Sequence, residues 1–112
     1  MTVKCEQYNR VCVLELPGDF VGDTAAEIKK TLDQQIEHGR ITDFILDFHK
    51  AGFVDSEGLE ALLWMKRRCE DLFGQLKLVQ LQENCRKILE LTRLSSRFEC
   101  HSDLATALKT MR

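Results

Sequence analysis

The chain has 112 residues, of which 44% are hydrophobic and 30% charged, and its formal net charge is −2. This length and balance fit one soluble globular domain over residues 1–112, and the slightly negative charge argues against nucleic acid as a partner. No apolar run approaches the roughly 20 residues of a membrane span, and no signal peptide begins at Met1. We therefore expect a cytoplasmic domain without membrane insertion.

Two strands are predicted at the start of the chain. Residues 3–6 form a short strand, and residues 10–16 alternate with apolar side chains on both faces, which indicates a largely covered strand. The segment 8–10 is short enough for a hairpin turn. The first strand can then pair antiparallel with the second at an edge of a sheet.

A helix is predicted after the turn at residues 17–19. Thr24 and Glu27 have the spacing of a capping box, in which each side chain bonds a backbone N–H of the other's turn. Gly39 is a typical residue just past a helix end. The buried face of this helix would carry four apolar side chains: Ala25, Ile28, Leu32 and Ile36.

Residues 41–48 are the candidate for the central strand, because a nearly continuous apolar run indicates burial on both faces. Asp47 interrupts this run near the carboxyl end of the strand, where open α/β sheets place their binding sites. Two interpretations of Asp47 stay open here: a functional carboxylate, or a cap for the following loop.

The segment 53–59, with the sequence FVDSEGL, joins that strand to a helix predicted over residues 59–73. Ser56 stands at or next to the first helical residue, among unpaired backbone N–H groups and at the positive end of the helix dipole. That position suits a polar cap, and it also suits an anionic group such as a phosphate. The second of these favours Ser56 as a regulatory phosphorylation site.

The helix over residues 59–73 has two predicted faces. Its core face carries Leu59, Leu62, Leu63, Cys69 and Phe73. Its other face carries Glu57, Glu60, Trp64, Arg67 and Asp71. A tryptophan among charged residues is either part of a binding surface, where aromatic residues are enriched, or folded onto a neighbouring loop.

The rest of the chain continues the alternation of strands and helices. A strand is predicted over residues 76–81, then a helix that begins at Glu83 or Asn84 and is broken by Ser95, then a short strand over 98–100. The apolar residues of that helix are Cys85, Ile88, Leu89, Leu91 and Leu94. A final helix, capped by Ser102 or Asp103, faces inward through Leu104, Ala107, Leu108 and Met111.

This order of elements predicts an α/β fold with a mixed, mostly parallel sheet of four or five strands and about four helices. Five cysteines show neither C-x-x-C nor zinc spacing, and their odd number without a secretion signal indicates reduced thiols. Cys5 and Cys12 fall in strand-like segments, where a free cysteine behaves as a small hydrophobe.

Few residues point to catalysis, so no enzyme and no cofactor is predicted. Phosphate-binding loops and the G-x-S-x-G motif are absent from the sequence, and no triad pattern links His49 to Ser56. Asp47, Asp55 and Glu57 form either a cation site or an ordinary acidic helix start. We predict no metal site.

Ser56 is better explained as a phosphorylation switch than as a catalytic residue. It would add roughly −1.5 to −2 charges, which the helix N-terminus partly offsets, so the fold should survive. Beside Asp55 and Glu57 the local surface would become strongly anionic, and a partner docked on Glu57, Glu60 and Trp64 would be repelled. The alternative is that Ser56 serves only as the N-cap of the helix.

The sequence resembles STAS domains, the family of bacterial anti-anti-sigma factors, also called anti-sigma factor antagonists. The matching residues are FILDF at 44–48 and FVDSEGL at 53–59, which is similar to the family's strand followed by Asp-Ser, a small residue and Gly-Leu. Support comes from LPGD at 16–19, from the strand at 76–81 and from the helical segment at 86–94. The similarity covers almost the whole chain.

The resemblance implies that Ser56 matches the serine that a partner kinase phosphorylates. That partner is the anti-sigma factor, a GHKL-type serine kinase; the unphosphorylated domain binds it and frees a sigma factor, and a PPM-type phosphatase resets the switch. Asp55, Glu57, Gly58, Glu60, Trp64 and Arg67 would then form the partner-binding surface of a monomer or weak dimer. A second expectation is a STAS adaptor that works without phosphorylation, such as a subunit of a lipid-transport complex.

Three positions depart from the family pattern. Val21 stands where the first loop of family members often carries Asp, which removes an acidic group near the serine. Glu57 replaces a common Ser or Thr. Glu60 and Trp64 fill positions that are often small, on the helix expected to meet the kinase. These changes bear on the choice of partner and leave the core pattern intact.

Overall fold

The computed structural model describes residues 3–111, so the predicted domain ends at residues 1, 2 and 112 lie outside it. Its sheet has the strand order β1-β2-β3-β4-β5. The first pair is antiparallel and the other three pairs are parallel. The strands are β1 (Lys4–Tyr8), β2 (Val11–Glu15), β3 (Asp43–Asp47), β4 (Leu76–Val79) and β5 (Glu99–His101). The predicted mixed, mostly parallel sheet with an antiparallel edge strand is confirmed.

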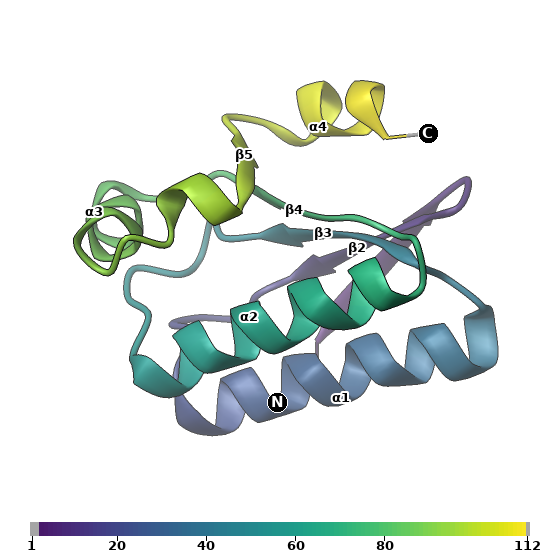
Figure 1. Cartoon of the computed structure of the whole chain (residues 1–112), viewed down its shortest axis with the longest axis horizontal. Helices are drawn as coiled ribbons and strands as arrows, with labels where there is room; N and C mark the ends of the chain where they lie inside the picture. Colours follow the sequence, from purple (N-terminus) through teal and green to yellow (C-terminus); the bar gives the residue numbers. More distant parts are fainter. Residues whose placement is uncertain (1–2, 112) are drawn as a thin grey trace.

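Four α-helices lie within the described residues: α1 (Gly22–Gly39), α2 (Ser56–Asp71), α3 (Glu83–Leu91) and α4 (Leu104–Thr110). A short 3₁₀ turn, Ser95–Arg97, precedes β5. Figure 1 shows α1 and α2 side by side over one face of the sheet and α4 over the other. None of the helices in residues 3–111 is long and apolar enough to cross a membrane.

Alternating residues of the strands divide the core between these two faces. Phe44 and Leu46 of β3 point toward α1 and α2, in the larger cluster of buried side chains, while Ile45 points toward α4. This burial on both faces is what the continuous apolar run of β3 predicts. Phe20 and Phe48 of the larger cluster meet edge to face, with ring centroids 5.9 Å apart.

The capping box predicted at Thr24 is wrong. Helix α1 begins at Gly22, three residues before the start that this box implies, and its N-cap is Val21, which makes no side-chain capping bond. The helix starts early because Phe20 is buried and bridged to Val54, so the chain turns immediately after this anchor. Thr24 is a buried residue of the first helical turn instead.

The inward direction predicted for Phe73 is also wrong, since this side chain is 99% exposed. Helix α2 ends at Asp71, and Phe73 takes the left-handed conformation with φ +62°. Glycine normally fills that position, but a Cβ on Gly74 would lie 1.8 Å from the carbonyl oxygen of Thr42. Gly74 is therefore needed for that close approach, and Phe73 makes the turn with its ring in solvent.

The third helix is shorter than predicted and ends at Leu91, which is 84% exposed instead of packed. Arg93 turns the chain with φ +61°, and the N–H of Leu94 bonds the carbonyl of Leu89 at 2.8 Å. This turn brings the half-buried Leu94 onto the core in place of Leu91.

Candidate functional site

The N-terminus of α2 is built around Asp55. Its backbone is extended, with φ −95° and ψ −175°, and its Oδ1 accepts a hydrogen bond of 2.8 Å from the backbone N–H of Gly58. Its carbonyl accepts the N–H of Leu59 at 3.0 Å. Asp55 is therefore the N-cap of this helix, and the alternative in which Ser56 caps it is excluded.

Ser56 is the first residue of α2 and is exposed. As the first helical residue it lies in the turn with unpaired backbone N–H groups, at the positive end of the helix dipole. The fold does not use this hydroxyl for capping, because Asp55 already does so. The arrangement presents a serine side chain to a protein arriving from solvent.

Gly58 is buried, which corrects its expected place on the partner-facing surface. A Cβ at this position would lie 2.1 Å from the carbonyl oxygen of Phe20 and 2.8 Å from Cγ1 of Val54. Glycine thus lets α2 approach the Phe20–Val54 bridge, which holds the first turns of α1 and α2 side by side (Figure 1). Gly58 therefore positions the first turn of α2, which carries Ser56, without being exposed itself.

Sequence reasoning missed two loop residues: Phe53 in the loop before Ser56 and Asp19 in the loop before α1. Phe53 is 45% exposed, three positions before the serine, and its carbonyl accepts the N–H of Phe20 at 2.9 Å. Asp19 accepts the N–H of Gly52 at 2.9 Å, so the first loop carries an acidic group despite Val21. The signal available in the sequence for Phe53 was an aromatic residue three positions before the predicted site.

The base of this loop is tied to α3. Asn84 donates from its side-chain amide to the carbonyl of Gly52 at 2.9 Å, and the buried Cys85 thiol donates to the carbonyl of Ala51 at 3.3 Å. Burial raises the pKa of the Cys85 thiol, and the nearby Asp19 carboxylate adds to the rise. Cys85 therefore acts as a small core residue, and the loop is anchored on both sides.

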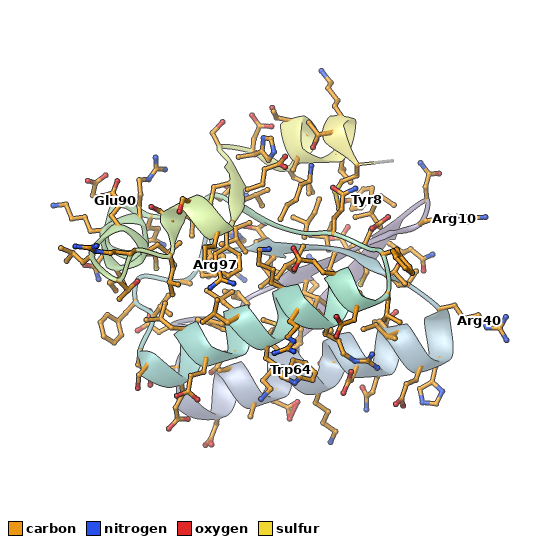
Figure 2. All side chains as sticks on the ribbon, viewed as in Figure 1. Tyr8, Arg10, Arg40, Trp64, Glu90 and Arg97 are labelled. Carbon is orange, nitrogen blue, oxygen red and sulfur yellow. The ribbon has the colours of Figure 1, made fainter. Side chains whose placement is uncertain are left out.

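Trp64 lies on the side of α2 that faces α1, as Figure 2 shows. The residue is 36% exposed, and the Lys29 ammonium lies 5.0 Å from the centroid of its ring, within cation–π range. The ring thus contacts a residue of α1, and about a third of the surface of Trp64 is left free. A shallow groove beside it is lined by Trp64 and by Lys29, Lys30, Asp33 and Glu37 of α1.

Three charged residues of the predicted surface are exposed along α2: Glu57, Glu60 and Arg67. Glu57 also approaches α1, because its Oε2 lies 3.9 Å from the place a Cβ on Gly22 would occupy. From the serine toward the middle of the helix, the surface therefore runs from acidic to the Trp64–Lys29 pair.

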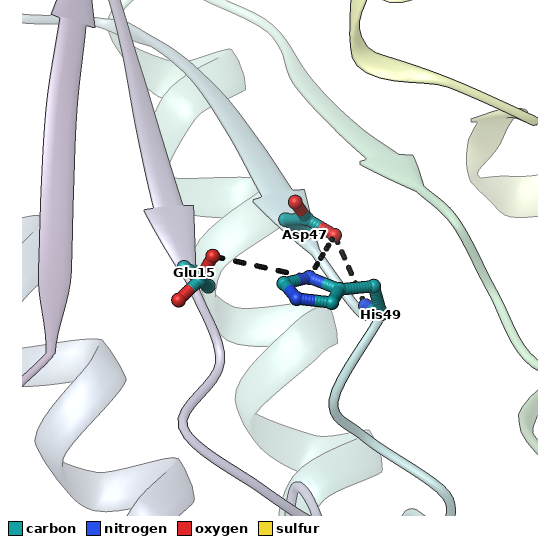
Figure 3. Close-up of side chains that lie close together, drawn as sticks. All are labelled: Glu15, Asp47 and His49. Carbon is teal, nitrogen blue, oxygen red and sulfur yellow. Dashed lines mark hydrogen bonds and ion pairs between the residues drawn. The ribbon is translucent and has the colours of Figure 1, made fainter.

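Asp47 caps the loop after β3, as one of its two interpretations predicts. It is buried and accepts the backbone N–H of His49 at 3.0 Å and the side-chain amide of Gln80 at 3.2 Å. Of the two interpretations left open for Asp47, Asp55 and Glu57, the cation cluster is not formed: in residues 3–111 the group of possible ligands is Glu15, Asp47 and His49, whose ligand atoms lie within 4.8 Å of one another (Figure 3). His49 Nδ1 is 3.2 Å from Asp47 and 3.9 Å from Glu15.

The family follows from the sequence as a whole. The model of the STAS domain family matches residues 2–107, nearly the entire chain. The chain belongs to the STAS domain family. Comparison with curated proteins gives no significant match.

Solved structures agree with this fold at low sequence identity. A putative anti-sigma factor antagonist from Thermotoga maritima superimposes with a TM-score of 0.91 at 17% identity, over 98% of this chain and 94% of that one. The Bacillus cell fate determinant SpoIIAA in its phosphorylated form superimposes with a TM-score of 0.75 at 22% identity, over 99% of this chain and 100% of that one. A sulfate transporter family protein from Wolinella succinogenes superimposes with a TM-score of 0.75 at 18% identity, over 91% of this chain and 84% of that one.

Proposed function

We propose that this STAS domain is an anti-sigma factor antagonist whose binding to its partner is switched by phosphorylation of Ser56. The observation that carries the proposal is the division of work at the start of α2: Asp55 caps the helix, and the exposed Ser56 hydroxyl is left for another protein. The partner would be an anti-sigma factor that is also a GHKL-type serine kinase, and a PPM-type phosphatase would reverse the modification.

The geometry supports a switch that changes charge and leaves the fold in place. A phosphate on Ser56 would sit at the positive end of α2, where an anion is stabilised by typically 0.3–1 kcal/mol. It would stand next to the exposed Glu57 and one turn from Glu60. Added charge here raises the repulsion of acidic groups on a partner, and a loss of about 3 kcal/mol weakens binding more than a hundredfold.

The partner surface would run from the exposed ring of Phe53, past Ser56, along Glu57, Glu60, Trp64 and Arg67. Trp64 and Phe53 supply the apolar contact area, and the charged residues fix its orientation. The domain acts in this scheme as a cytoplasmic binding module and not as an enzyme, and it needs no nucleic acid or membrane insertion.

Trp64 also favours a second candidate function, a STAS adaptor bound permanently to one partner. In that case the Trp64–Lys29 pair would grip the partner, and Ser56 would have no regulatory role. The two functions differ in a single property, the response of binding to charge at position 56.

The proposal is tested by phosphate transfer. The kinase that co-purifies with the chain is incubated with the chain and ATP, and the mass of the intact chain is measured by mass spectrometry. We expect one added phosphate on the wild type and none on Ser56→Ala. Ser96→Ala removes another exposed serine and should leave the transfer unchanged. A wild-type chain without added phosphate, while a known substrate of the kinase is modified, would remove the switch.

A further inference from the structure

Two cysteine sulfurs meet at the edge of the sheet. Cys5 Sγ of β1 and Cys12 Sγ of β2 lie 2.6 Å apart. In the register of this antiparallel pair Cys5 is opposite Leu14 and Cys12 is opposite Gln7, so the two cysteines are diagonal neighbours on the same face. That face is the one covered by α1 and α2, because Cys12 and Leu14 belong to the larger core cluster.

The two thiols differ in access to solvent. Cys5 is exposed on the edge strand, whereas Cys12 is fully buried. Burial raises the pKa of the Cys12 thiol, and its hydrogen bond with Cys5 adds to the rise. An oxidant from solvent therefore reaches Cys5 first, and the buried Cys12 sulfur is in contact with the sulfur that is oxidised.

In residues 3–111, no other two cysteine sulfurs are in contact. Cys69 and Cys85 are buried at separate places, and the exposed Cys100 donates its thiol hydrogen to the carbonyl of Phe98 at 3.8 Å. Exposure alone is thus not what distinguishes Cys5 from Cys100. The distinguishing feature is a second thiol already in contact.

We propose that Cys5 and Cys12 are an oxidation site, at which a hydroperoxide joins the two sulfurs as a disulfide between β1 and β2. The Cys5 thiolate attacks a peroxide oxygen and the O–O bond breaks, which gives a sulfenic acid on Cys5. The hydroxide or alkoxide that is released takes up the proton that the Cys5 thiol lost and leaves as water or an alcohol. Cys12 Sγ then attacks Cys5 Sγ, the S–O bond breaks, and the released hydroxide leaves as water with the Cys12 proton. Two electrons pass from the two thiols to the peroxide.

The bond changes how β1 is held. All five residues of this edge strand are exposed, and it pairs on one side only, with β2. A disulfide closes a small ring around the hairpin turn and prevents β1 from separating from β2. Unpaired edge strands are sites of association with other chains, so oxidation at this pair fixes the edge when an oxidant is present.

The chain offers a direct test, because trypsin cuts after Lys4, Arg10 and Lys29 and so separates the two cysteines into peptides 5–10 and 11–29. The protein is treated with hydrogen peroxide, free thiols are blocked in denaturant, and the digest is analysed by mass spectrometry without reduction. We expect these two peptides joined, an intact mass lower by two hydrogens, and a fall in free thiols from five to three. Dithiothreitol should restore all five.

Three variants complete the test. Cys5→Ala and Cys12→Ala should each abolish the intramolecular bond, while Cys100→Ala, which removes the other exposed cysteine, should leave it intact. The peptide map of the wild type decides the question even where a variant folds poorly. The proposal is overturned if peptides 5–10 and 11–29 stay separate while Cys5 is oxidised further to a sulfinic acid, joins a second chain, or stays a free thiol.

Discussion

The Asp55 carboxylate accepts a hydrogen bond of 2.8 Å from the backbone N–H of Gly58. Asp55 directly precedes Ser56, the serine on which the proposed function depends. This contact closes the first turn of α2 without any help from Ser56. The helix start is therefore divided between a residue that serves the fold and a residue that is available for modification.

The first prediction separates those two roles. Asp55→Ala should lower the free energy of unfolding by about 1 kcal/mol, the usual cost of losing an N-cap, and Ser56→Ala should change it by less than roughly 0.5 kcal/mol. Urea denaturation of both variants measures the difference, and Asp55→Asn, which can still cap, is the matched control. An equal loss in Asp55→Ala and Ser56→Ala would mean that the serine serves the fold.

The second prediction concerns the contact beneath the site. Gly58→Ala should destabilise the domain by roughly 1–3 kcal/mol, because its Cβ would press on the backbone of Phe20, which cannot swing aside. Gly18→Ala is the control, since nothing lies within 4 Å of a Cβ there. Thermal unfolding compares the two, and equal stability of both variants would refute the account of α2 docking.

The third prediction places the partner surface. Trp64→Ala should weaken partner binding by a factor of ten or more, about 1.4 kcal/mol or above, as for other partly buried aromatic anchors. Phe73→Ala removes the side chain of a residue that is 99% exposed, two residues past the far end of the same helix, and should leave the affinity unchanged. Titration calorimetry gives both affinities. If Phe73→Ala weakens binding and Trp64→Ala does not, the surface lies elsewhere.

The fourth prediction concerns how the stability of the domain depends on pH, through charged side chains of β4 and β5 at the edge of the sheet opposite β1. The buried Lys77 ammonium donates to Glu99 at 2.7 Å, and His101 Nε2 lies 2.6 Å from the same carboxylate oxygen. Both contacts, Lys77 first, hold the pKa of Glu99 below its usual value. The stability they contribute is present above the unfolded pKa of about 4.3 and is lost as pH falls through the lowered folded pKa.

The measurement is the free energy of unfolding of the wild type and Glu99→Gln from about pH 7 to about pH 3. We expect the wild type to be more stable at neutral pH and the difference to shrink toward the acid end. Glu90→Gln, at an exposed position of α3, should show a flat difference. A difference for Glu99→Gln that stays constant over this range would contradict the ion pair.

The sequence predicted the fold because its local signals agree with the tertiary structure. The short, nearly continuous apolar run of β3 is typical of a strand buried on both faces. The turn before α2 places Ser56 at a helix start. Which side chain caps α2 was not readable, since Asp and Ser are equally good N-caps. Only the coordinates assign that role to Asp55.

The errors arose where a distant contact overrides a local pattern. Phe73 has helical spacing, but the close approach of Gly74 to Thr42 forces the turn onto Phe73 and sends its ring outward. Helix α1 starts before the capping box because the bridge between Phe20 and Val54 fixes the chain there. Neither contact has a signal in the neighbouring sequence.

The affinity of the partner kinase for the chain before and after phosphorylation tests the central claim most directly. Calorimetry is performed with unmodified chain, with chain carrying one phosphate on Ser56, and with Ser96→Asp as a control for added charge at another exposed serine. We predict tight binding of the unmodified chain and of Ser96→Asp, and binding at least about a hundredfold weaker after phosphorylation. Equal affinity of the phosphorylated and unmodified chains would contradict the switch.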